Sequence, residues 1–134
     1  MRKINKIILH CSATREGRNF TVEDIASWHR QRGFTTIGYH FVIYLDGTVH
    51  KGRDVNVIGA HTVGQNAYSI GICYIGGLDA SGKPADTRTP EQKEAMRNLV
   101  NSLKDKYPGA TVHGHNEFAN KACPCFDVRK EFRV

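Results

Sequence analysis

The sequence predicts an α/β domain with a central mixed β-sheet flanked by helices. Short apolar segments that suit buried strands alternate with longer segments in which apolar residues recur at helical spacing. An Asp-Gly dipeptide between two of these strands indicates an antiparallel hairpin, so we expect a mixed sheet instead of an all-parallel one. Because the 134 residues contain no linker or internal repeat, residues 1–134 are expected to form a single domain.

The N-terminal part predicts a strand followed by a helix. Residues Ile4 to Leu9 form an apolar run typical of a buried strand, which puts His10 where that strand ends. The polar stretch Ser12 to Asn19 is interpreted as a loop. Thr21 is a candidate N-cap for a helix that ends at Gly33.

Two strands and a turn are expected next. Residues 39–45 and 48–51 flank Asp46-Gly47, a dipeptide that tolerates positive φ and is typical of hairpin turns. Residues Ser69 to Ile75 form another apolar strand, and a polar, glycine-containing loop follows as far as Asp86.

The C-terminal part predicts a long helix, a short strand and a terminal helix. The segment Thr89-Pro90-Glu91-Gln92 combines an N-cap, a proline at the first helical position and a reciprocal cap. Apolar residues then recur at helical spacing through Leu103. Residues Thr111 to His115 suit a last strand, and Asp127 is a candidate cap for a short helix.

Composition limits the class of partner. Nineteen Lys and Arg residues against 13 Asp and Glu residues give a net charge of +6, which favours polyanionic partners such as nucleic acid, membrane surfaces or anionic cell-wall polymers. The basic residues are scattered and form no nucleic-acid-binding motif, so we expect no nucleic-acid partner. No apolar run approaches the roughly 18 residues that span a bilayer. We therefore expect no stable membrane insertion and no signal peptide, and hence synthesis in the cytoplasm. We also expect a monomer.

A few histidine and cysteine residues could bind a metal. His10 ends the first strand, and His113 and His115 are expected on one face of the last strand because side chains alternate along a strand. Cys123 lies eight residues beyond His115, within reach of a returning loop. Imidazole and thiolate are preferred zinc ligands, and three protein ligands are typical of a catalytic zinc site. Spacing alone leaves His113 and His115 as equal candidates.

Several short motifs extend over nearly the whole chain. In order, they are Ile8-Leu9-His10-Cys11-Ser12-Ala13-Thr14, Gly38-Tyr39-His40-Phe41, Asp46-Gly47-Thr48, Gly59-Ala60-His61-Thr62, Asn66, Ser69-Ile70-Gly71-Ile72, and His115 through Lys121-Ala122-Cys123-Pro124. Their order and residue types resemble those of the zinc N-acetylmuramoyl-L-alanine amidases of the phage lysozyme and peptidoglycan recognition protein superfamily. The resemblance implies that superfamily's fold.

The resemblance also implies roles for individual residues. His10, His115 and Cys123 would ligate Zn²⁺, which leaves His113 a supporting role. Zinc at such a site makes water nucleophilic near neutral pH, as amide hydrolysis requires. Tyr39 and Lys121 would line the reacting centre as catalytic residues.

Other polar residues are expected in the surroundings of this centre. His61, in the Gly-Ala-His segment, would lie in the substrate groove, and Asn66 and Arg53 could contact the peptide stem. Glu117 is an alternative proton shuttle if the last strand continues past His115. Cys125 departs from the family pattern, and a second thiol beside the metal could compete for zinc.

The expected function is hydrolysis of the amide bond between N-acetylmuramic acid and L-alanine in bacterial peptidoglycan. The motifs resemble those of phage lysozymes, so we expect an endolysin that acts on the cell wall after release from the cytoplasm. Two alternatives remain open: a peptidoglycan-binding module without activity, and a zinc peptidase that cuts within the stem peptide. The presence of Tyr39, Lys121 and Cys123 favours the enzyme over the binding module.

Overall fold

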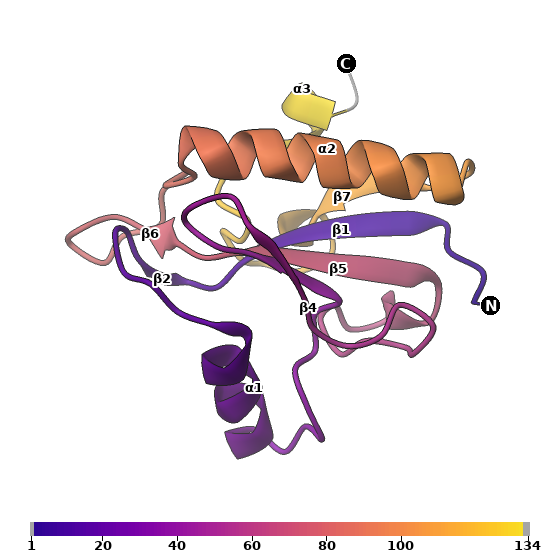
Figure 1. The fold of residues 1–134 in the computed structure, drawn as a ribbon, viewed down its shortest axis with the longest axis horizontal. Coiled ribbons are helices and arrows are strands. Elements are labelled where there is room, and N and C mark those ends of the chain that lie inside the picture. The colour runs from indigo at the N-terminus through magenta and orange to yellow at the C-terminus, as the bar shows by residue number, and fades with distance from the viewer. Residues whose placement is uncertain (1, 133–134) are drawn as a thin grey trace.

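A five-stranded mixed sheet forms the centre of the computed structural model, which describes residues 2–132 (Figure 1). The strand order is β4-β3-β5-β1-β7; β3 and β4 are antiparallel and the other neighbours are parallel. The strands are β1 (Lys6–Cys11), β3 (Phe41–Ile43), β4 (Val49–Lys51), β5 (Ser69–Tyr74) and β7 (Thr111–Gly114). The predicted mixed sheet and the hairpin around Asp46-Gly47 are confirmed.

The helices begin where local capping motifs predict. Helix α1 (Val22–Gln31) has a capping box between Thr21 and Asp24, and α2 (Pro90–Lys106) has one between Thr89 and Gln92. Each box satisfies backbone N–H groups that the first helical turn leaves without partners. The Asp127 carboxylate accepts from the backbone N–H of Lys130 in α3 (Val128–Phe132).

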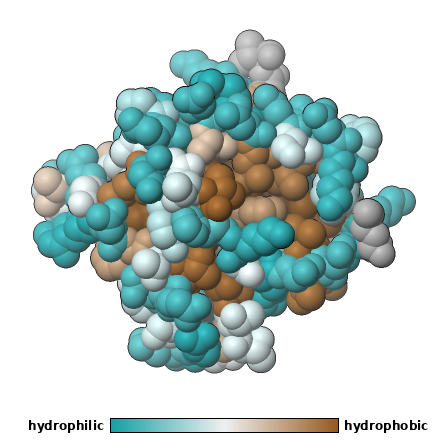
Figure 2. Space-filling view, viewed as in Figure 1, coloured by the Kyte–Doolittle hydropathy of each residue, from teal (hydrophilic) through white to brown (hydrophobic). Residues whose placement is uncertain are grey.

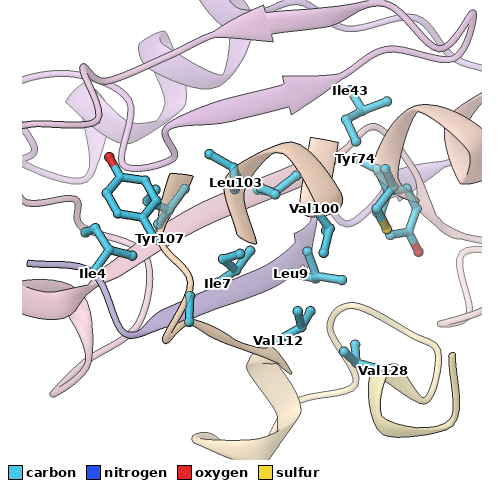
Figure 3. Packing of buried hydrophobic residues seen from close by; sticks show 14 of the residues in the cluster. Ile4, Ile7, Leu9, Ile43, Tyr74, Val100, Leu103, Tyr107, Val112 and Val128 are labelled. Carbon is cyan, nitrogen blue, oxygen red and sulfur yellow. The ribbon is translucent and has the colours of Figure 1, made fainter. Parts of the chain in front are cut away.

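The two faces of the sheet pack against different helices. Ile7 and Leu9 of β1 point toward Val100 and Leu103 of α2 (Figure 3), in a core that includes Val128 of α3. Helix α1 lies on the opposite side of the sheet (Figure 1), where Ile25 and Ala26 pack with Val42 and Cys73. Since strand side chains alternate, His10 points to the α1 face.

Some boundaries differ from the sequence-based expectation. The predicted loop 12–19 contains β2 (Thr14–Arg15), which pairs with β6 (Gly77–Leu78) in a second, parallel sheet. Strand β7 ends at Gly114, and His115 opens the 3₁₀ helix η2 (His115–Glu117). A second 3₁₀ helix, η1 (Asn66–Tyr68), precedes β5.

A buried arginine holds the C-terminal segment against the domain. The Arg88 side chain, 1% exposed, pairs with Asp86 at 2.9 Å and with Glu131 of α3 at 2.6 Å. Its guanidinium lies 3.4 Å from the centre of the Phe126 ring. These contacts fix both ends of residues 126–131 and thereby steady the preceding loop, which carries Cys123.

The face of the molecule drawn in Figure 2 is hydrophilic mainly around its edge. In Figure 2, hydrophilic residues cover α2 and much of α1, and apolar residues gather between these two helices. Within residues 2–132, no helix has the length and apolar character needed to cross a bilayer.

Candidate metal centre and active site

Three potential ligands meet at the carboxyl ends of two neighbouring parallel strands. His10 lies near the end of β1, and His115 directly follows β7, the strand that pairs with β1. Cys123 returns on the loop after η2. One potential ligand atom from each residue lies within 4.8 Å of the other two. Two zinc ligands at tetrahedral angles are roughly 3.5 Å apart, so a small contraction of this cluster accommodates the ion.

The His115 ring carries the clearest sign of a missing partner. Its Nδ1 atom is buried and has no hydrogen-bond partner among the described residues. Buried polar atoms in folded proteins almost always have a partner, which can be an ion. Burial, with a further contribution from the charge of Lys121, lowers the pKa of His115. The ring is thus kept neutral, which is the state that binds a metal.

The two nitrogens of His10 have separate partners. Its Nδ1 atom lies 4.0 Å from Sγ of Cys123, whereas its Nε2 atom lies 2.9 Å from Nδ1 of His61 and 3.3 Å from Oγ1 of Thr62. The His10 ring is buried, and burial, followed by the charges of His61 and His115, lowers its pKa well below the ordinary value. A neutral His10 can donate from Nε2 to His61 and leave Nδ1 for a metal.

His61 is in turn fixed by its own loop and by β5. The Asn66 side chain accepts from the backbone N–H groups of His61 and Thr62, at 3.0 and 2.9 Å. Ser69 Oγ lies 3.3 Å from Nε2 of His61. Gly71 of β5 leaves room for the ring, because a Cβ atom there would lie 2.6 Å from Cγ of His61. These contacts fix the His61 ring in the position from which it orients the His10 ring.

The thiol of Cys123 is oriented by the backbone. The N–H of Cys11 donates to Sγ of Cys123 at 3.2 Å, which stabilises a thiolate. Cys125 has another environment: its thiol lies 3.3 Å from the carbonyl oxygen of Gly77 and 3.9 Å from Sγ of Cys11. The hydrogen bond with Cys11, together with burial, raises the pKa of Cys125. A protonated Cys125 is a poor competitor for zinc.

The interpretation that puts His113 and His115 on one strand face was wrong. The strand ends at Gly114, so the alternation does not extend to His115. His113 lies 2.7 Å from Oγ1 of Thr111 and 3.1 Å from Oε1 of Glu117. The other oxygen of Glu117 accepts from the N–H of Gly114 at 2.8 Å. Glu117 therefore caps η2 beside His113, and the condition for its role as a proton shuttle, a strand continuing past His115, is not met.

Two open cavities flank the cluster. The α1 cavity, of about 240 Å³, is bordered by Trp28, His29, Tyr39 and Cys123 among others. The His61 cavity, of about 260 Å³, is bordered by Phe34, His61, Thr62 and Asn66 among others. Arg32, His115 and Lys121 border both. Such adjoining cavities can hold the two sides of an extended substrate around one reacting bond.

The predicted catalytic residues are at these cavities. Tyr39 borders the α1 cavity with its ring centre 5.0 Å from that of His10. Burial raises the pKa of Tyr39 well above its ordinary value, so its hydroxyl is a proton donor near neutral pH. Lys121 is exposed and borders both cavities, where its ammonium can face an anionic group.

The predicted substrate-binding residues differ in position. His61 and Asn66 border the His61 cavity, although the side chains of both are engaged in holding the site. Arg53 borders neither cavity; its guanidinium donates to the carbonyl oxygens of Ile37 and Ile58. Sequence reasoning missed Arg32 and Thr62. Thr62 stood in the Gly-Ala-His-Thr motif, but Arg32 looked like an ordinary basic residue at a helix end.

A His, His, Cys cluster beside open cavities is an arrangement that metal-dependent hydrolases use. Residues 1–126 match the family model of the N-acetylmuramoyl-L-alanine amidases. The protein therefore belongs to the N-acetylmuramoyl-L-alanine amidase family.

Similar proteins agree with this family. The chain is 43% identical to an endolysin of Klebsiella phage KP32 over 129 residues, which cover 96% of this chain and 85% of that protein. The structure resembles the amidase LysC of Clostridium intestinale, with a TM-score of 0.79, 32% identity, and coverage of 92% and 77%. It also resembles a mutant of Drosophila PGRP-LB in complex with tracheal cytotoxin, with a TM-score of 0.79, 28% identity, and coverage of 92% and 76%. The chain is a peptidoglycan amidase of the phage endolysin type.

Proposed function

We propose that this amidase is zinc-dependent and binds Zn²⁺ through His10, His115 and Cys123. The observation that carries the proposal is the buried Nδ1 atom of His115, which lacks a hydrogen-bond partner among the described residues, in a residue that lies together with His10 and Cys123 as a possible metal ligand. Neutral imidazoles and a thiolate suit zinc better than the hard cations Mg²⁺ and Ca²⁺. Zinc bound there would supply Lewis acidity and make water nucleophilic at neutral pH.

The protein's own groups would then stabilise the reacting amide. We propose that the Tyr39 hydroxyl, kept protonated by burial, donates a hydrogen bond at the reacting centre. The Lys121 ammonium would stabilise negative charge as it develops on the carbonyl oxygen. His61, held by Asn66 and Ser69, would keep the His10 ring in one orientation.

The proposed substrate is the bond between N-acetylmuramic acid and the first L-alanine of the stem. The two cavities support an extended substrate with glycan on one side and peptide on the other. The protein would act on the bacterial cell wall as a monomer after release from the cytoplasm. Direct substrate contacts by His61, Asn66 and Arg53 stay a prediction.

A digest of purified peptidoglycan, analysed by mass spectrometry, tests the cleavage site. The proposal expects stem peptides with a free N-terminal L-alanine and glycan strands with unsubstituted lactyl groups. New termini inside the stem would identify a peptidase instead. Sedimentation of the protein with the wall without any new termini would identify a binding module.

Paired cysteine variants test the metal. Cys123→Ala should lose bound zinc, measured by elemental mass spectrometry, and lower turnover by at least about 10³-fold, since a ligand of the metal that activates water is removed. Cys125→Ala removes a thiol two residues away and should keep both zinc and turnover. A Cys123→Ala protein with wild-type zinc content would refute the ligand assignment.

A further inference from the structure

The wall shared by the two cavities carries two exposed cations. Arg32 and Lys121 border both cavities, together with His115. Neither cavity has an Asp or Glu residue in its described lining. Among residues 2–132, no carboxylate forms an ion pair with Arg32 or Lys121. The groove beside the metal ligands is therefore positively charged and attracts an anionic ligand.

We propose that Arg32 binds a carboxylate of the stem peptide and makes the enzyme prefer stems with free carboxylates over stems with amidated ones. The inference rests on the proposed function, because it assumes that a stem peptide occupies this groove. It adds a specificity-determining residue to Tyr39 and Lys121, which act at the reacting amide itself.

The backbone holds Arg32 in a defined place. Arg32 is the C-cap residue of α1, and its N–H donates to the carbonyl oxygens of Trp28 and His29. Its guanidinium carbon lies 5.2 Å from the centre of the Phe34 ring, which also borders the His61 cavity. A guanidinium supported by an aromatic ring loses less freedom when it binds a ligand. Arg32 is thus an exposed but partly ordered cation.

The chemistry of Arg32 suits a carboxylate and differs from that of Lys121. A guanidinium presents two parallel N–H groups that match both oxygens of a carboxylate, whereas an ammonium is a compact point charge. An amidated stem presents an NH₂ group to one of these donors and carries no charge. The pair of donors therefore distinguishes the two stems, while Lys121 remains available for the carbonyl oxygen.

Arg32 has a purely structural explanation as well. A cation at the C-terminus of α1 interacts favourably with the helix dipole. That interaction would affect stability and leave the affinity for different stems unchanged. Arg30 provides the matched control, since it is exposed in the last turn of the same helix and borders neither cavity.

The test compares two synthetic muropeptides that differ only in whether the stem carboxylates are free or amidated. The wild-type enzyme should prefer the free form by about 10- to 100-fold in kcat/KM, expressed mainly in KM, which is the range for a hydrogen bond to a charged group. Arg32→Gln should abolish the preference, Arg32→Lys should keep part of it, and Arg30→Gln should keep all of it.

A binding measurement separates this inference from the proposed reaction. Trp28 is the only tryptophan and borders the α1 cavity, so its fluorescence reports binding without turnover. If the wild-type enzyme binds the free stem more tightly but does not cleave it at L-alanine, the proposed function fails and the role of Arg32 stands. Three results would overturn the role of Arg32. The wild-type enzyme could bind both stems with equal affinity, Arg32→Gln could keep the wild-type preference for the free stem, or Arg32→Gln and Arg30→Gln could lose that preference equally.

Discussion

The Nδ1 atom of His61 lies 2.9 Å from the Nε2 atom of His10, whereas the other nitrogen of His10 faces Cys123. By accepting a hydrogen bond at Nδ1, the His61 ring can thus keep the proton of His10 on Nε2 and leave Nδ1 of His10 unprotonated. With His61 accepting at Nδ1, its Nε2–H points toward Ser69 Oγ at 3.3 Å, which completes a consistent set of donors and acceptors. Supports of this kind orient metal ligands in proteins.

Removing the His61 ring should weaken zinc binding without removing a ligand. His61→Ala should lower zinc affinity and turnover by about 10- to 100-fold, because His10 would lose its orienting acceptor. His61→Asn supplies an acceptor oxygen in place of Nδ1 and should recover much of the affinity. Competition with a chelator of known affinity measures both. Equal losses in the two variants would show that ring packing, and not the hydrogen bond, is what His10 needs.

The Tyr39 hydroxyl should contribute to turnover and little to metal binding. Tyr39→Phe keeps the ring beside His10 and should keep the zinc content, while kcat falls by about 10²-fold as a proton donor is lost. Burial raises the pKa of Tyr39, so the wild-type rate should show no basic limb from tyrosine deprotonation below about pH 10. The pH profiles of kcat for wild type and variant check this. Unchanged kcat would assign Tyr39 to packing alone.

His40 should make the fold sensitive to acid. Its ring is fully buried; Nδ1 accepts from the N–H of Gly71 at 3.0 Å, and Nε2 faces the carbonyl oxygen of Val57 at 2.8 Å. Burial lowers the pKa of His40 to about 4, against the opposing hydrogen bond to Val57, with smaller effects of the charges of Arg2, Arg53 and Asp54. The unfolded chain therefore takes up a proton near pH 6.5 that the folded chain resists.

The contribution of His40 to the free energy of unfolding should thus fall as the pH drops from about 6.5 to about 4. The loss between pH 7 and pH 4.5 should be about 2 to 3 kcal/mol from this group. His40→Asn retains an acceptor for Gly71 and should show a correspondingly smaller loss. Urea unfolding of metal-free protein at both pH values measures it, with His50→Asn, at the sheet edge, as the control. Parallel pH dependence in wild type and His40→Asn would contradict the prediction.

Local signals predicted the helices well, and long-range packing decided what they could not. The capping boxes of α1 and α2 join residues three positions apart, so sequence alone reveals them. Strand β7 ends at Gly114, where the Glu117 carboxylate accepts from the Gly114 N–H. The expected alternation of side chains along the strand could not predict this end. The sequence around Arg88 did not indicate that its side chain is buried and paired, because its partner Glu131 lies 43 residues away.

The sequence by itself determined the α/β class, the helix starts and the set of residue types from which a zinc site can be built. Spacing left His113 and His115 as equal candidates, the family motifs chose His115, and the structure places it beside His10 and Cys123. Only the tertiary structure decided that the Arg53 side chain binds backbone carbonyl oxygens and that Arg32 borders both cavities. The physical reason is distance along the chain. Caps and turns are encoded within a few residues, whereas His10 and Cys123 lie 113 residues apart and meet only because β1 and β7 pair in one sheet.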